Sequence, residues 1–141
     1  MGQQQLLLLV LGIVIVGLAV VVGIQAFGEN QKKANADAMV NDGVRIASDI
    51  QAWALKPQAF GGPSTSGDFS GVSFEAIGYS VSSNTYTNLN ASYGLGTPAA
   101  ACVMISGTSL SPNDNNVYVK VEGTRPEDIT TEVNPTTAPT C

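Results

Sequence analysis

The feature that most constrains this chain is an uncharged, apolar run near its N-terminus. Residues 6–27 read LLLLVLGIVIVGLAVVVGIQAF, and no charged side chain occurs between Met1 and Gly28. At helical rise this run spans about 33 Å, close to the hydrocarbon thickness of a bilayer. A surface this apolar does not stay in water, so its expected partners are lipid or further copies of the same run.

Two simpler interpretations of the run stay open. A cleaved secretory signal would have a shorter apolar region behind a basic stretch, whereas only Met1, Gly2 and three glutamines precede this one. A plain single-span anchor also fits, but Lys32 and Lys33 would then favour a cytoplasmic location for the rest of the chain. The cysteines of the chain favour the opposite side of the membrane.

The residues that follow predict a continuing helix with one apolar face. No proline occurs from Glu29 to Lys56, and Pro57 ends the pattern because the residue before a proline resists helical torsion angles. Small and apolar residues recur there at steps of three and four, as on one helix face. They are Ala36, Val40, Gly43, Ala47, Ile50 and Ala54, with Met39, Val44 and Trp53 widening the stripe.

Beyond a loop rich in glycine and proline, the pattern changes to the alternation typical of strands. Strands are predicted at 72–76 with an extension at 79–81, at 85–91 or 93–95, at 101–106 and at 117–121. Residues 111–116 form the turn before the last strand, and the proline-containing tail from Thr124 predicts an irregular strap.

The expected fold is therefore α+β, with one long helix packed on a small antiparallel sheet. Residues 1–28 form an apolar transmembrane or filament-core helix, and residues 29–141 form a globular head. Within the head we predict an amphipathic helix at 29–56, a loop at 57–71, and a sheet with a C-terminal strap at 72–141.

Composition argues against several classes of function. The net charge is −5, from 11 acidic and six basic residues, so nucleic acid is not an expected partner. Histidine, the commonest general base and metal ligand, is absent, and no GxSxG motif occurs. We expect neither an enzyme nor a cofactor. Cys102 and Cys141 form no CxxC motif, and a disulfide in an oxidising compartment is their natural interpretation.

Two weaker candidate sites lie in the head. Asn113, Asp114 and Asn115 offer oxygen ligands of the kind calcium prefers, but they lack EF-hand spacing and equally suit a hairpin turn. Asn90 begins an Asn-Ala-Ser sequon and is a candidate for glycosylation, as is the threonine-rich tract at 136–140.

The order of these parts resembles the type IV pilin family: an apolar helix continued as an amphipathic one, a small sheet, and a cysteine pair near the C-terminus. The resemblance implies that Met1 is the first residue of the mature chain. It also implies a prepilin peptidase, a platform protein and an ATPase as assembly partners. The family commonly has glutamate where this chain has Gln5, and proline where it has Val22. The resemblance is therefore to a divergent branch of the family.

The resemblance implies a structural subunit that waits in the inner membrane and then polymerises with copies of itself. The product would be an extracellular filament at the cell surface, used for adhesion or motility. The residues expected to mediate polymerisation are Met1, Gln5, Leu6, Leu9, Ile13, Val14, Val16, Val20, Ile24 and Phe27. The alternatives are a pseudopilin of a type II-like secretion system and a membrane-anchored binding domain.

Overall fold

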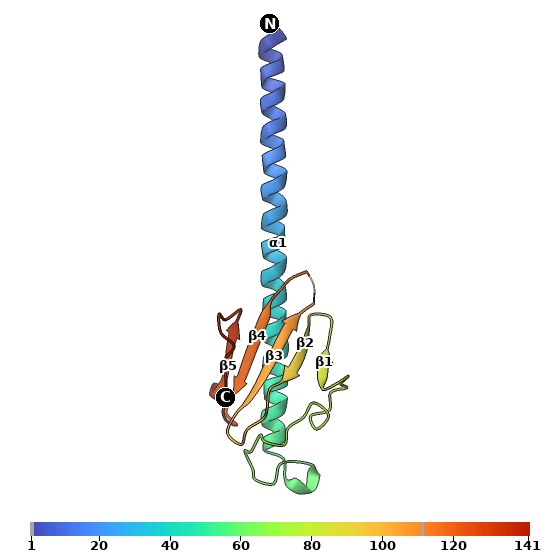
Figure 1. Cartoon of the computed structure of the whole chain (residues 1–141), viewed down its shortest axis with the longest axis vertical. Helices are drawn as coiled ribbons and strands as arrows, with labels where there is room; N and C mark the ends of the chain where they lie inside the picture. Colours follow the sequence, from blue (N-terminus) through green and yellow to red (C-terminus); the bar gives the residue numbers. More distant parts are fainter. Residues whose placement is uncertain (1, 111) are drawn as a thin grey trace. The chain divides into compact units, whose positions relative to one another are not determined.

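The computed structural model describes residues 2–110 and 112–141 and has an α+β fold (Figure 1). It consists of a 53-residue helix, five strands and two short 3₁₀ helices. In chain order these are α1 (Gly2–Ala54), η1 (Gln58–Phe60), β1 (Thr85–Thr87), β2 (Ala91–Leu95), β3 (Val103–Ser109), β4 (Asn116–Val121), η2 (Pro126–Asp128) and β5 (Ile129–Val133). The strands form one sheet in the order β1-β2-β3-β4-β5, and each is antiparallel to the next.

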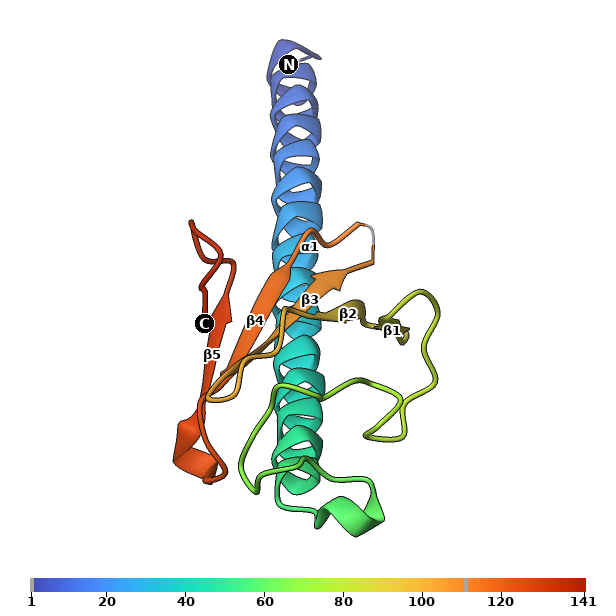
Figure 2. The same cartoon turned by 60° about the horizontal axis from the view of Figure 1, so that its bottom comes forward.

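The chain divides into two units, whose described parts are residues 2–33 and 34–141 with Ser111 omitted. Throughout the first unit the chain is helical and every described residue is exposed. The second unit, which we call the head, contains the rest of α1 and the whole sheet. Figure 2 shows the strands crossing one side of this part of α1. The predicted fold class is confirmed.

The core of the head lies between α1 and the inward face of the sheet. Strands β3 and β4 point alternate residues inward, as the two-residue period of a strand requires. The buried face of α1 confirms most of the predicted stripe but adds Ile46 and Gln51, while Ala36, Val40 and Val44 are only half-buried. The inward residues of the two central strands are Val103, Ile105, Val117, Val119 and Val121.

Close packing in the core of the head depends on two glycines, Gly43 on α1 and Gly107 on β3. A Cβ atom at Gly43 would lie 2.6 Å from Cγ2 of Val119, and one at Gly107 would lie 2.8 Å from Cε1 of Tyr93. Both distances are far shorter than van der Waals contact. Because Gly43 has no side chain, the backbone of α1 can approach β4 closely at this position of the stripe.

The predicted strand at 72–76 and 79–81 was wrong. Residues 74–78 form turns, and the residues beside them belong to no strand. The amide of Tyr79 donates to the carbonyl of Phe74, and the amide of Ile77 donates to the carbonyl of Ser73. Val72 and Phe74 are buried, so their alternating pattern reflects two side chains that enter the core from turns. Gly78, with φ of 87°, allows the chain to reverse there.

Three other boundaries differ from the prediction. The stretch 85–95 holds two strands, because the side-chain oxygen of Asn88 accepts hydrogen bonds from the amides of Asn90 and Ala91 and closes a tight turn. The strand predicted at 101–106 lies at β3, starting two residues later and running further. The tail is not wholly irregular, since Ile129 and Val133 of β5 pair with β4 between the prolines that flank that strand.

Candidate functional site

The most prominent candidate site is the apolar surface of α1 from Leu6 to Phe27. Its sixteen large apolar side chains are each at least half exposed, Leu6 and Phe27 at 67%. In the part of the chain that the structure describes, α1 is the one helix long and apolar enough to cross a membrane. The surface thus lacks cover from the rest of the described chain, and it is suited to lipid or to a protein partner.

The residues predicted to mediate polymerisation lie on this surface. They surround the helix, because consecutive positions of an α-helix are about 100° apart. Their contact with another copy of the chain stays a prediction, and Met1 lies outside the described residues. The exposed members are Gln5, Leu6, Leu9, Ile13, Val14, Val16, Val20, Ile24 and Phe27.

Glycines interrupt the same surface at three positions. Apart from its chain neighbours and the adjoining backbone of α1, a Cβ atom added at Gly12, Gly17 or Gly23 would meet no described atom within 4 Å. Glycine costs about 1 kcal/mol relative to alanine in a helix interior. Small residues are common where helices approach one another in membranes, so these positions fit contacts that form with another helix.

A disulfide joins Cys102 to Cys141 and confirms the predicted bond. It ties the end of the tail to the residue before β3, across a sequence separation of 39. Disulfides persist in oxidising compartments and are rare in the cytosol. The bond therefore indicates an extracytoplasmic location for the head.

Asn90, the glycosylation candidate, belongs to a hydrogen-bond network around Asp42. The side-chain amides of Asn90 and Asn88 each donate to Oδ2 of Asp42 at 2.8 Å, and the Tyr93 hydroxyl donates to the same oxygen at 3.2 Å. The nitrogen that would carry a glycan thus already contacts α1. Glycosylation of Asn90 stays a prediction.

The predicted calcium ligands lie in the turn between β3 and β4. Asn115 is buried, its amide nitrogen donates to Oδ1 of Asn35, and its side-chain oxygen accepts from Nδ2 of Asn134. These bonds connect the turn to α1 and to the tail after β5. Among the described residues no group of three or more His, Cys, Asp or Glu residues is placed to hold a metal ion. Calcium binding at Asn113, Asp114 and Asn115 stays a prediction.

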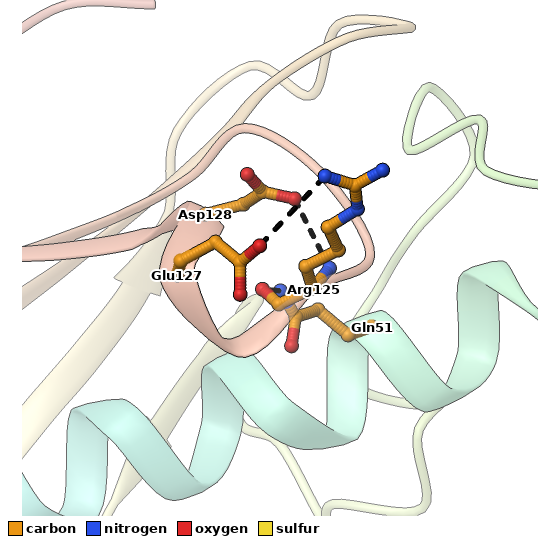
Figure 3. Close-up of polar contacts among 4 residues, drawn as sticks. All are labelled: Gln51, Arg125, Glu127 and Asp128. Atoms are coloured by element: carbon orange, nitrogen blue, oxygen red, sulfur yellow. Dashed lines mark hydrogen bonds and ion pairs between the residues drawn. The ribbon is translucent and has the colours of Figure 1, made fainter.

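Sequence reasoning missed Gln51, which connects α1 to the turn that precedes β5 (Figure 3). Its Nε2 donates to the carbonyl oxygens of Gly123 and Arg125, both at 2.7 Å. The amide of Arg125 donates to Oδ2 of Asp128, and its guanidinium lies 3.7 Å from Glu127. The available signal was spacing, because Gln51 lies four residues after Ala47 on the apolar stripe.

Comparisons of the chain with protein-family models, with curated proteins and with solved structures gave no match. The architecture itself resembles the pilin fold, since a long apolar N-terminal helix continues onto an antiparallel sheet and a disulfide closes the C-terminal region. These features define a pilin-like architecture, with a helix that could span a membrane and a disulfide that indicates an extracytoplasmic head.

Proposed function

We propose that this chain is a structural subunit that polymerises through α1 into an extracellular, type IV pilus-like filament used for adhesion or motility. The observation that carries the proposal is the continuous apolar surface from Leu6 to Phe27, exposed on all sides of the helix. A single membrane anchor needs such a surface, and so does a filament core built from many copies of one helix.

The energetics favour a protein partner that replaces lipid around the apolar surface of α1. Burying a large apolar side chain contributes about 1.5–3 kcal/mol, so holding all sixteen in water would cost on the order of 20 kcal/mol or more. Transfer from lipid to a bundle of identical helices carries almost no such cost, because both surroundings are apolar. The inner membrane then serves as a reservoir of subunits before assembly.

Assembly by this route needs other proteins. The proposal requires a prepilin peptidase, a platform protein and an ATPase that extracts subunits from the membrane. The filament would lie at the cell surface, with the heads outside its helical core. The disulfide supports this orientation, because Cys102 and Cys141 belong to the head.

Electron microscopy of material sheared from cells that express the chain tests the proposal. We expect long fibres that contain it. A Val14→Asp variant should form none, because an aspartate in a lipid- or helix-lined core has no counter-charge. Val14→Leu is the matched control and should give fibres at wild-type yield.

The outcomes distinguish the alternatives. A chain recovered only in the membrane fraction, with no fibres, would favour a membrane-anchored binding domain, and short periplasmic assemblies would favour a pseudopilin. Wild-type fibre yield from Val14→Asp would refute polymerisation through the apolar helix. Emission from the buried Trp53 shows whether the variant's head is still folded.

A further inference from the structure

The head contains an open polar cleft that the filament function does not use. Three segments line it: α1 through Arg45 and Asp49, the turn at 77–80, and β1 through Tyr86. Its volume is about 340 Å³. Small-molecule sites start at roughly 300 Å³, so the cleft has room for one small ligand or for one unit of a larger one.

One wall of the cleft is built from two firmly supported tyrosines, Tyr79 and Tyr86. The rings of Tyr79 and Tyr86 meet edge to face with centroids 4.7 Å apart. Behind them, the fully buried Phe74 lies 6.2 Å from each ring, and Tyr93 stacks on Tyr86 at 6.1 Å. The turn that carries Tyr79 is held by its amide bond to Phe74. Such a wall is preorganised, which lowers the cost of ordering on binding.

The polar groups of the cleft carry opposite charges on one face of α1. Arg45 and Asp49 are four residues apart, yet among the described residues Arg45 takes part in no ion pair. Oδ2 of Asp49 accepts a hydrogen bond from the Tyr79 hydroxyl. Burial, and then Asp49, raise the pKa of Tyr79 to about 12, so the hydroxyl stays a neutral donor at physiological pH.

We propose that this cleft binds one carboxylate-bearing sugar unit of an acidic saccharide. Arg45 offers a planar guanidinium that matches a carboxylate, and Asp49 has oxygen capacity for sugar hydroxyls. The exposed lining of the cleft is mostly polar, which suits a ligand that carries several hydroxyl groups. A more highly charged ligand, such as a polyphosphate, fits poorly because Asp49 and the net charge of −5 oppose it.

The test uses the full-length chain in detergent micelles and two probes, methyl glucuronide and methyl glucoside. The two differ in the carboxylate, so they isolate the contribution of Arg45. Ligand-observed NMR titration should give a Kd on the order of 1 mM for the glucuronide, as expected for an open cleft with few contacts. The glucoside should bind about tenfold more weakly.

Variants locate the site. Arg45→Gln should weaken glucuronide binding about tenfold, to the level of the glucoside, while Arg45→Lys should retain part of the difference. Arg125→Gln removes the same charge from an exposed position outside the cleft and should change neither affinity. Trp53 emission checks that each variant is folded.

Three results would overturn the proposal. Equal binding of the two glycosides would exclude recognition of the carboxylate, and unchanged binding by Arg45→Gln would place the site elsewhere. The absence of saturation well above the expected Kd would show that the cleft takes no such sugar. None of these results bears on filament formation, because soluble glycosides test the head and fibre yield tests the apolar helix.

Discussion

Gly43 offers the sharpest test of how α1 packs on the sheet. In a Gly43→Ala variant the new methyl group would lie 2.6 Å from Cγ2 of Val119. Val119 cannot easily withdraw, because it is 1% exposed on β4, between β3 and β5, and its branched side chain is stiff. We therefore expect the helix and the sheet to be forced apart locally.

The magnitude follows from two opposing contributions. Overpacking a well-filled core costs about 1–3 kcal/mol, while alanine gains up to about 1 kcal/mol over glycine in a helix interior. The free energy of unfolding should therefore fall by about 1–2 kcal/mol. Gly28→Ala is the matched control on the same helix, because its Cβ would meet no described atom within 4 Å apart from its chain neighbours and the adjoining helix backbone.

A double-mutant cycle makes the prediction specific. Val119→Ala alone should destabilise the head by about 2–3 kcal/mol, by removing two buried methyl groups. In that background Gly43→Ala should become stabilising, because the new methyl group enters the space that Val119 vacated. Chemical denaturation of the full chain in detergent, followed by the single buried Trp53, measures all four proteins. Equal effects of Gly43→Ala in both backgrounds would refute the packing argument.

Three further predictions concern other parts of the chain. Reduction of the Cys102–Cys141 bond should destabilise the head by about 4 kcal/mol, the chain-entropy value for its separation of 39, and free thiols in intact-mass analysis of unreduced protein would contradict the bond. Since the pKa of Tyr79 is raised to about 12, the neutral Tyr79 hydroxyl should contribute fully to stability below about pH 10, and this contribution should be lost as pH rises toward 12. Ultraviolet titration should detect the formation of the Tyr79 phenolate at this high pH, and Asp49→Asn should shift that titration to lower pH. In a filament we predict local unwinding within residues 12–23, where glycine weakens the helix, and a near-atomic map with unbroken helical hydrogen bonds there would disprove it.

The helix could be predicted from sequence because both of its halves carry strong, local signals. The run from Leu6 to Phe27 has no charge, and the stripe after it keeps helical spacing until Pro57. The strand Asn116–Val121 was equally clear, since valines alternate with polar residues. In each case an apolar face or an entirely apolar surface leaves a pattern that can be recognised in the sequence.

The turns and the edge strands could not be predicted in the same way. Val72 and Phe74 alternate like a strand, but each enters the core from a turn whose backbone bonds are local. β5 is an edge strand with mostly exposed residues, so its pairing with β4 leaves little apolar pattern. The cleft was missed for a related reason, because Arg45, Tyr79 and Tyr86 come from separate segments that only the folded head brings together.

Two signals in the chain disagree about which side of the membrane holds the head. Lys32 and Lys33 follow the apolar run after four residues, and basic residues near a span favour the cytoplasm. The Cys102–Cys141 bond favours the opposite side, because the cytosol keeps thiols reduced. The rule that basic residues lie on the cytoplasmic side is a statistical tendency, and here it depends on two lysines. The disulfide, by contrast, is a covalent bond of the fold that joins the tail to the residue before β3. The bond is therefore the stronger evidence, and it supports a filament or a surface domain whose head leaves the cytoplasm.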